Sequence, residues 1–366
     1  MGARVEPSRI IVVGGTGNFG GRICRRLAIE PGVRVIATGR AQRGSSSGDI
    51  DYARLDLDAD KLPARLAALH PSVVIHCAGP FQGQDYRVAQ AALAAGAHYL
   101  DLADGRAFVA QFAGAVHGAA LRAQRVAISG ASTLPGLSSA VIEHLLHWFS
   151  RLDAVDMVIA PGQRAPRGTA TVAAVLSYAG RPFPWWIDGR WQTAHGWQQL
   201  RRVRFPFGDR LAAACDVPDL ALFPGHYASV RTVTFRAALE LPLQQLALWS
   251  LAGLRRCGLP LPLQRWAGLN RVAGWMDGLG GDCGGMSVEL IGLSAGGAAR
   301  RSRWLLTARD NHGPEIPCMA AVLLSLKLAR GDALAPGARP CMGLLALEEF
   351  SPEFARWGIT TCIEDC

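Results

Sequence analysis

The sequence of 366 residues lacks the features that would place it in a membrane, secreted or nucleic-acid-binding class. No uninterrupted apolar run has the length of a membrane span, and no signal-like segment precedes the first apolar strand. The nine cysteines lack paired metal-ligand spacing, so we expect reduced thiols and no metal centre. Zinc-finger spacing, RNP-like motifs and a helix-turn-helix pattern are also missing, which argues against a nucleic-acid partner. These absences predict a cytoplasmic protein without a transmembrane segment.

The composition is that of a compact globular protein. Half of the residues are hydrophobic and only 18% are charged, which argues against disorder. The length suggests about two domains. The formal net charge of +9 comes mainly from arginine and favours anionic ligands, such as bound phosphates and an acidic small-molecule substrate.

A glycine-rich turn follows the first apolar run. Residues 10–13 form a continuous β-branched segment, as expected for a strand buried on both faces of a parallel sheet. Gly14, Gly17 and Gly20 have a Gly-x-x-Gly-x-x-Gly spacing, a variant of the dinucleotide fingerprint. A helix predicted over 18–29 would point its first backbone N–H groups at bound phosphates, although a purely structural turn is the alternative. The predicted cofactor-binding residues here are Gly14, Thr16, Gly17, Asn18, Phe19 and Gly20.

The end of the second predicted strand, residues 33–38, indicates which cofactor binds. Arg40 occupies the position at which an acidic residue would bind the ribose hydroxyls of NAD. An arginine pairs instead with the 2′-phosphate of NADP, and Arg43 is expected to complete that pocket. We therefore expect NADP (NADPH), with NAD the less favoured cofactor. Asp56, at the end of a third strand predicted over 52–57, either contacts the adenine or begins the next loop.

A second turn is expected beside the ribose and nicotinamide. It follows a strand predicted over 73–77, and ligands of open parallel sheets lie beyond the carboxyl ends of the strands. Its predicted cofactor contacts are Ala78, Gly79, Pro80 and Phe81. Strands and helices alternate up to residue 132, which predicts an α/β fold with a doubly wound parallel Rossmann sheet.

Three side chains are candidates for catalysis, because hydride transfer needs a nearby proton donor or acceptor. Tyr99 and Asp101 share one face of a strand predicted over 98–101, since side chains alternate along a strand. Asp101 is the first candidate for orienting substrate or exchanging a proton, and capping of the next helix is its alternative role. His226, in a Gly-His-Tyr sequence ahead of a β-branched run, is the third candidate, with an ordinary loop histidine as the alternative.

Four short blocks occur in order along the chain. They are residues 14–20 (Gly-Gly-Thr-Gly-Asn-Phe-Gly), 77–81 (Cys-Ala-Gly-Pro-Phe), 96–101 (Gly-Ala-His-Tyr-Leu-Asp) and 134–139 (Leu-Pro-Gly-Leu-Ser-Ser). Together they resemble the saccharopine dehydrogenase/reductase-like family, and residues 348–354 resemble it more faintly. The resemblance implies an NAD(P)-binding Rossmann domain joined to an α/β domain that helps close the active site and often forms a homodimer. It also implies relatives that reduce an imine formed between an amine and a carbonyl compound.

Three segments are expected: an NADP-binding Rossmann domain over 1–133, a substrate and dimerisation α+β domain over 134–340, and a C-terminal segment over 341–366 returning to the Rossmann domain. The second domain is expected to open with a helix over 135–149 and to contain a mixed sheet with helices. Its tryptophan-rich stretch, 184–197, predicts a hairpin whose aromatic side chains enter the core, line a substrate pocket or meet a partner. Residues 241–276 predict two amphipathic helices for core or dimer packing, with peripheral membrane contact as the alternative.

These observations predict an NADP-dependent oxidoreductase of the saccharopine dehydrogenase-like type, transferring hydride to or from a small carbonyl, imine or amine substrate. A non-catalytic NADP-binding sensor that docks on a partner or membrane is the alternative. An enzyme that uses the nicotinamide without net redox change is a third interpretation. The sequence does not specify the substrate, because specificity depends on side chains that the fold brings together.

Overall fold

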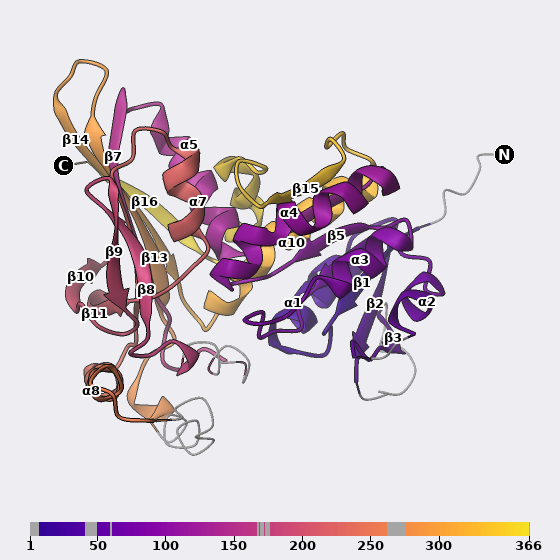
Figure 1. Cartoon of the computed structure of the whole chain (residues 1–366), viewed down its shortest axis with the longest axis horizontal. Coiled ribbons are helices and arrows are strands. Elements are labelled where there is room, and N and C mark those ends of the chain that lie inside the picture. Colours follow the sequence, from indigo (N-terminus) through magenta and orange to yellow (C-terminus); the bar gives the residue numbers. More distant parts are fainter. Residues whose placement is uncertain are drawn as a thin grey trace. The chain divides into compact units, whose positions relative to one another are not determined.

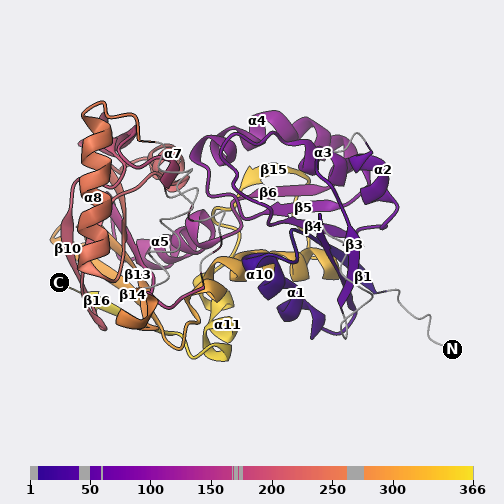
Figure 2. The same ribbon diagram turned by 90° about the horizontal axis from the view of Figure 1, so that it is seen from below.

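The computed structural model describes residues 7–40, 50–58, 61–166, 168, 172, 176–261 and 276–365. The chain forms two compact units (Figure 1, Figure 2). Unit 1 contains Met1–Leu137 and Glu315–Leu345, and unit 2 contains Ser138–Pro314 and Ala346–Cys366. The predicted fold class, a doubly wound parallel Rossmann sheet with a second unit built on a mixed sheet, is confirmed.

Unit 1 is organised around a parallel sheet. Its strands are β1 (Ser8–Val13), β2 (Val33–Gly39), β3 (Ile50–Arg54), β4 (Val73–His76), β5 (His98–Asp101), β6 (Val126–Ser129) and β15 (Gly337–Pro340). They pair in the order β15-β6-β5-β4-β1-β2-β3. Residues 10–13 of β1 are fully covered on both faces, as the continuous apolar run predicts. The strand order reverses direction between β1 and β4, and ligands of such sheets bind outside the carboxyl ends of the strands at this point.

The helices of unit 1 cover the sheet. They are α1 (Asn18–Ala28), α2 (Leu62–Ala67), α3 (Arg87–Ala94), α4 (Arg106–Ala123) and α10 (Ile316–Arg330), with a short π-helical turn, η1 (Thr133–Leu137). In α1 the side chains of Ile23 and Leu27 are fully buried, which explains why the apolar spacing in this segment predicts a helix. The helix α10 ends at Gly331, whose φ of +83° lies in the left-handed region that suits a glycine C-cap.

Residues 315–345 lie in unit 1, although the expected boundary assigned residues 134–340 to the second domain. The strand β15 extends the Rossmann sheet by pairing in parallel with β6, from Gly337 opposite Val126 to Pro340 opposite Ser129. A parallel neighbour requires a crossover connection, and α10 provides its helix. The sequence between β6 and α10 builds most of unit 2. The order of elements along the chain therefore did not predict that residues 315–345 belong to unit 1.

Unit 2 is built on a mixed sheet. Its strands are β7 (Arg151–Ala160), β8 (Pro182–Ile187), β9 (Arg190–His195), β10 (Arg201–Phe205), β11 (Gly208–Ala214), β12 (Thr232–Ala238), β13 (Gly284–Leu293), β14 (Ala299–Ala308) and β16 (Thr360–Asp365). The main path is β10-β11-β12-β7-β13-β14-β16, with β8 joining β12 to β9. The strands β7 and β12 are parallel, and the other pairs are antiparallel.

The helical segments of unit 2 are α5 (Ser138–Leu146), α7 (Asp219–His226), α8 (Pro242–Arg256), α11 (Ser351–Arg356), η3 (Asp277–Leu279), η4 (Gly313–Glu315) and η5 (Leu347–Phe350), the last residue of η4 falling in unit 1. One sheet face is apolar: Phe235, Met157, Val288 and Trp304 lie directly opposite one another on β12, β7, β13 and β14, and all are buried. The ring of Trp304 packs 6.5 Å from that of Phe354 in α11. This face is therefore covered by helical structure.

Three expectations about the second half differ in detail from the structure. The predicted helix over 135–149 begins within the π-helical turn η1, which reaches Leu137, and α5 covers only Ser138–Leu146. The C-terminal residues 346–366 lie in unit 2 rather than with the Rossmann sheet, since β16 pairs with β14. Of the two amphipathic helices expected over 241–276, α8 is the first, and residues 262–275 lie outside the described residues.

The ion pair between Arg22 of α1 and Glu315, next to α10, generates a test of the unit 1 assignment. The two side chains are only 14% and 7% exposed. We expect Arg22→Gln to lower the free energy of unfolding by about 3 kcal/mol, because it leaves a largely buried carboxylate uncompensated. The matched change Arg34→Gln removes the pair with Asp51, whose partners are 54% and 37% exposed, and should cost less than about 1 kcal/mol. Equal losses in urea unfolding would contradict the assignment.

Candidate functional site

The glycine turn between β1 and α1 has no room for side chains at key positions. Gly14 has a φ of +77°, in the region that favours glycine. A Cβ at Gly20 would lie 2.2 Å from the carbonyl oxygen of Gly14, so only glycine lets α1 begin this close to the turn. A Cβ at Gly15 would lie 2.8 Å from the Cα atom of Ala37 in β2. These approaches fit a dinucleotide-binding turn, which must be tight and closely packed by its helix.

The beginning of α1 suits a bound pyrophosphate. Its first turn carries no acidic residue, and among the described residues no side-chain hydrogen bond caps it at Gly17. The first backbone N–H groups of a helix lack acceptors within the helix and attract anions. Thr16 and Gly17 are exposed, and Asn18 and Phe19 are half-buried. The six residues predicted to bind the cofactor here therefore lie together in one turn that fits a dinucleotide.

The end of β2 lies against the glycine turn. A Cβ at Gly39 would lie 2.9 Å from Oγ1 of Thr16, and the exposed Arg40 follows directly. This position beside the turn is where the ribose of a dinucleotide is recognised. Asp56 follows β3, and its carboxylate accepts a hydrogen bond from the backbone N–H of Asp58 at 3.2 Å, as expected for the start of a loop. Arg43 lies outside the described residues.

The second predicted turn, residues 78–81, meets the glycine turn. A Cβ at Gly14 would lie 3.0 Å from the backbone nitrogen of Ala78. The side-chain amide of Gln84 donates hydrogen bonds of 2.8 Å to the carbonyl oxygens of Ala78 and Pro80, which fixes the turn. Phe81 is buried against Phe108, with ring centroids 5.4 Å apart. The structure thus brings both predicted cofactor segments together, while the supporting role of Gln84 had no recognisable sequence signal.

Asp101 is fully buried at the carboxyl end of β5. Its Oδ1 atom accepts hydrogen bonds from the Ser129 hydroxyl (2.9 Å) and from the backbone N–H groups of Gly130 (2.8 Å) and Ala103 (3.0 Å). Burial raises the pKa of Asp101 from 3.8 to about 6, although these hydrogen bonds act in the opposite direction. The contact with Ala103 agrees with the alternative, local capping role, and the bonds to residues 129 and 130 join the ends of β5 and β6.

Tyr99 is also buried and lies beside a histidine that was not among the candidates. Its hydroxyl is 3.3 Å from Nδ1 of His76, at the end of β4. Burial lowers the pKa of His76 to about 4 and raises that of Tyr99 well above its usual value. Around neutral pH both groups are therefore uncharged. This pair forms a polar contact between adjacent strands inside unit 1.

His226, in unit 2, is the accessible member of the three predicted catalytic residues. It ends α7, its side chain is 46% exposed, and its Nε2 atom lies 3.5 Å from a carboxylate oxygen of Glu143 in α5. Nearby in the same unit, the Ser138 hydroxyl donates a hydrogen bond to the fully buried Asp219. Burial raises the pKa of Asp219 to about 7. Glu143 supplies the carboxylate partner that could not be chosen from the sequence, because it lies on a different helix.

The tryptophan-rich stretch forms the predicted hairpin. Asp188 and Gly189 join β8 to β9 with positive φ angles of 53° and 74°, as a two-residue hairpin turn requires. Trp185 and Trp197 are buried, whereas Trp191 is 50% exposed. Most of this aromatic surface therefore belongs to the core of unit 2, which was one of the alternatives left open by the sequence.

Residues 10–133 match the family model for the saccharopine dehydrogenase NADP binding domain. The chain combines a Rossmann unit, in which this match lies, with a second unit built on a mixed sheet. The match covers the first three sequence blocks, so the predicted resemblance to the saccharopine dehydrogenase-like family is confirmed. No curated protein matches the chain.

Solved structures share this two-unit fold. Apo histidine-tagged saccharopine dehydrogenase (L-Glu forming) from Saccharomyces cerevisiae has a TM-score of 0.68 at 12% identity, covering 98% of this chain and 100% of that chain. C. glutamicum DAP dehydrogenase in complex with DAP has a TM-score of 0.53 at 15% identity, covering 95% and 99%. Amine dehydrogenase from Mycobacterium smegmatis has a TM-score of 0.50 at 11% identity, covering 90% and 94%. Such low identities establish similarity of fold alone.

The described residues also bear on membrane-spanning helices and metal sites. In these ranges, no helix combines the length and apolar character needed to cross a membrane. Nor do the same residues contain a group of three or more histidine, cysteine, aspartate or glutamate side chains that could hold a metal ion.

The buried carboxylate of Asp101 predicts a pH dependence of stability. Between pH 4 and 6 the unfolded chain ionises this group while the folded protein retains the proton, so this contribution to stability decreases as pH rises. The pKa difference corresponds to about 3 kcal/mol. Asp101→Asn keeps an acceptor for Ser129 and cannot ionise, so the variant should lack this decrease in urea unfolding from pH 4 to 7. Asp56→Asn is the control. An Asp101→Asn profile parallel to that of the wild type would contradict the prediction.

Proposed function

We propose that the chain is an NADP-dependent oxidoreductase that transfers hydride to or from a small carbonyl, imine or amine substrate. The observation that carries this proposal is the glycine turn with Arg40 beside it, within a segment that matches an NADP-binding domain. The backbone of the turn would hold the pyrophosphate, and the Arg40 guanidinium would pair with the 2′-phosphate. NAD lacks that phosphate and would leave Arg40 without its partner.

The remaining cofactor contacts follow from the adjacent turns. The segment from Ala78 to Phe81 would contact the ribose and nicotinamide, because it ends β4 beside the glycine turn. When bound, NADP supplies or accepts the hydride. The protein has then to position the substrate, exclude water and move a proton to or from it.

His226 is the group we assign to proton exchange. Its imidazole is accessible, and Glu143 lies close enough to orient it. Asp101 and Tyr99 are fully buried and bonded to neighbouring strands, so their contribution would be to hold the carboxyl edge of the Rossmann sheet. In this proposal they are positioning residues, and His226 meets the substrate.

Two observations support the substrate class and assembly. Proteins with the same fold are named for saccharopine, DAP and amines, which favours a substrate with a carbon–nitrogen bond. The net charge of +9 favours an acidic one. The family resemblance further leads us to propose a homodimer, which sedimentation of the full chain would measure.

A non-catalytic sensor that docks on a partner or membrane is the second candidate. The helix α8 supports it by exposing Leu243 (69%), Leu246 (42%), Trp249 (39%) and Leu254 (47%). An apolar helix face with arginines at its end suits a membrane surface. Turnover separates the two functions: nicotinamide absorbance changes with amines or oxo acids would support the enzyme, and vesicle binding without turnover would support the sensor.

Cofactor preference tests the role of Arg40. The wild-type protein should bind NADPH more tightly than NADH in a fluorescence titration. Arg40→Ala should weaken NADPH binding by about 10- to 100-fold, the range for losing hydrogen bonds to a charged group, and leave NADH binding unchanged. Arg34→Ala, at the opposite end of β2, is the matched control. An unchanged preference in Arg40→Ala would exclude Arg40 as the partner of the 2′-phosphate, and equal binding of NADPH and NADH by the wild-type protein would exclude the NADP assignment.

Turnover tests the role of His226. Once a substrate is found, His226→Asn should lower kcat by about 100-fold or more, because positioned acid–base groups contribute at least this much. NADPH affinity should stay at the wild-type value, since the imidazole has no role in cofactor binding. Glu143→Gln should lower kcat to a smaller extent, because it removes the carboxylate that orients the imidazole. His147→Asn serves as the control, and full activity in His226→Asn would refute the assignment.

A further inference from the structure

The strand β16 is an end strand of the unit 2 sheet. It pairs with β14 along one edge, and among the described residues no strand pairs with its other edge. All six of its residues, Thr360–Asp365, are exposed. An end strand presents a row of backbone N–H and C=O groups that can pair with another extended chain.

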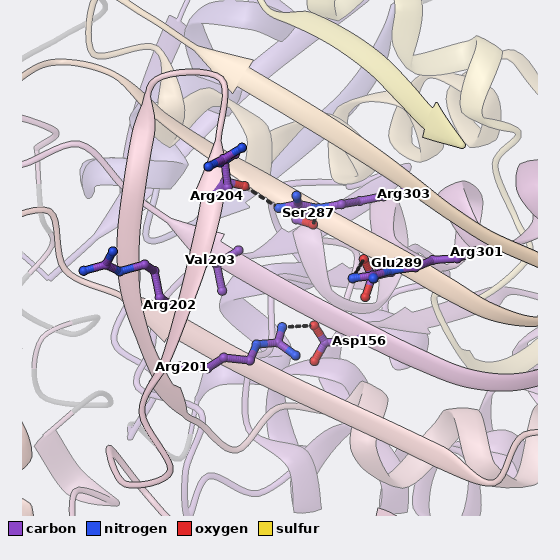
Figure 3. A pocket seen from close by; sticks show the side chains of 9 residues that line it. All are labelled: Asp156, Arg201, Arg202, Val203, Arg204, Ser287, Glu289, Arg301 and Arg303. Atoms are coloured by element: carbon purple, nitrogen blue, oxygen red, sulfur yellow. Dashed lines mark hydrogen bonds and ion pairs between the residues drawn. The ribbon is translucent and has the colours of Figure 1, made fainter. Parts of the chain in front are cut away.

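The other end strands carry features that hinder such pairing. At the opposite end of the main path, β10 carries Arg201, Arg202 and Arg204 (Figure 3). The strand β9 belongs to a hairpin attached to the sheet through one residue pair, and two-stranded ribbons twist strongly. In unit 1, β15 has only four residues and ends in Pro340, and β3 carries Asp51 and Arg54. Charge, proline, shortness and twist all protect a sheet edge.

The strand β16 lacks this protection. It contains no proline, glycine or lysine, and its register with β14 runs without a bulge. Its two acidic side chains are engaged with β14: Asp365 accepts a hydrogen bond of 2.6 Å from the Ser302 hydroxyl and lies 3.1 Å from Arg300, and Glu364 lies 3.7 Å from Arg303. The remaining four side chains are neutral, and three of them are β-branched, which suits a strand that pairs on both edges.

We propose that the free edge of β16 pairs in antiparallel fashion with β16 of a second copy of this chain. The inference rests on the homodimer of the proposed function and names its interface. A two-fold axis perpendicular to the sheet brings two copies of one strand together in opposite directions, so that identical edges match. The pairing uses the free edge of both copies, and the arginines of β10 protect the other end of each sheet. Assembly therefore stops at a dimer.

The side chains of β16 indicate where the axis lies. With Cys362 at the axis, Thr361 faces Ile363 of the second copy, and such β-branched pairs stabilise a sheet. Thr360 then faces Glu364 of the second copy, to which its hydroxyl can donate a hydrogen bond. With Ile363 at the axis, Glu364 would face Cys362, a poor hydrogen-bond donor. Like charges meet in neither arrangement, and the first gives the better pairs.

A second copy fits this edge better than a foreign peptide does. Peptides that add to a sheet edge are selected through pockets for alternate side chains. Thr360, Cys362 and Glu364 share the face of the sheet that carries Glu289 and Arg303, here called the polar face. The cavity on that face is lined by no residue of β16 (Figure 3). Identical strands need no such pocket, because their own side chains supply the match.

Sedimentation of the full chain over a range of concentrations tests the interface through charge. At the axis each side chain meets its own copy, so Cys362→Lys places two ammonium groups opposite each other. It should raise the dissociation constant of the dimer by about fivefold relative to Cys362→Ser. Thr360→Lys, the matched control, adds the same charge on the same face but opposite Glu364 of the second copy, and should not raise the constant. Equal effects of the two lysine changes would overturn the interface.

Oxidation with diamide tests the position of the axis. Directly opposite residues of an antiparallel pair have Cα atoms about 4.5–5.5 Å apart, within the range that a disulfide spans. All proteins in this experiment carry Cys366→Ser, because Cys366 directly follows β16 in the sequence. Two chains should become linked through Cys362 on a non-reducing gel. Removal of another exposed thiol, by Cys257→Ser, should leave the link intact, whereas Cys362→Ser should abolish it. A dimer that forms no Cys362 link would overturn the proposed pairing.

The outcomes separate this inference from the proposed function. The strand β16 contains none of the residues assigned to NADP or to proton exchange, so Cys362→Lys should retain wild-type NADPH affinity. A wild-type protein that stays monomeric would refute both the homodimer and its interface. A dimer that responds to neither lysine change would refute the interface alone. Failure of the wild-type protein to bind NADPH would refute the proposed function and leave a β16 dimer standing.

Discussion

The close approach of two backbone turns, after β1 and after β4, is the constraint on which the organisation of unit 1 depends. Gly14 and Ala78 come so near that a Cβ at Gly14 would lie 3.0 Å from the Ala78 nitrogen. These strands flank the point at which the strand order reverses. Bulky side chains are therefore excluded from the place where a dinucleotide would lie, and its recognition would depend on backbone N–H groups and on residues at the margin, such as Arg40.

Two buried carboxylates, Asp101 and Asp219, hold neighbouring elements together. Asp101 joins the ends of β5 and β6 through Ser129 and Gly130, so it fixes the carboxyl edge of the sheet beyond β4. Asp219 has a similar relation to Ser138 in unit 2. Burial favours the neutral form of both acids, and each is committed to hydrogen bonds within its own unit. Groups in this condition hold strands and helices in place more readily than they exchange protons with a substrate.

The parts of the structure that were predictable from the sequence are those determined locally. The spacing of Gly14, Gly17 and Gly20 predicts a tight turn, because the close contacts that require glycine lie within the same strand-turn-helix segment. The Asp188-Gly189 hairpin was predictable for the same reason. By contrast, α10 is buried over most of its surface, and nothing in such a helix specifies which sheet it covers. The helix belongs to unit 1 because β15, which follows it, pairs with β6, and these two strands are far apart in sequence.

In the candidate site, too, local features were predictable from the sequence and contacts between distant segments were not. Sequence spacing predicts that the glycine turn, residues 78–81 and Arg40 lie at one edge of the sheet, and the structure has them there. The sequence could not reveal that Asp101 and Tyr99 are enclosed by neighbouring strands. Burial depends on the packing of β4, β5 and β6 together. The pairing of His226 with Glu143 likewise joins two helices far apart in sequence. Side-chain partners of this kind have no periodic signal that a single sequence could display.

Arginine side chains gather on one face of the unit 2 sheet. The chain contains only two lysines, Lys61 and Lys327, so its positive charge is carried almost entirely by guanidinium groups. On the polar face of the unit 2 sheet, several of these groups lie near one another, and like charges in a confined region destabilise the compact state. Asp156 and Glu289 offset part of this repulsion through direct pairs. Glu364 of β16, 3.7 Å from Arg303, offsets a further part, so pairs that link β7, β13, β14 and β16 hold the guanidinium groups of this face in place.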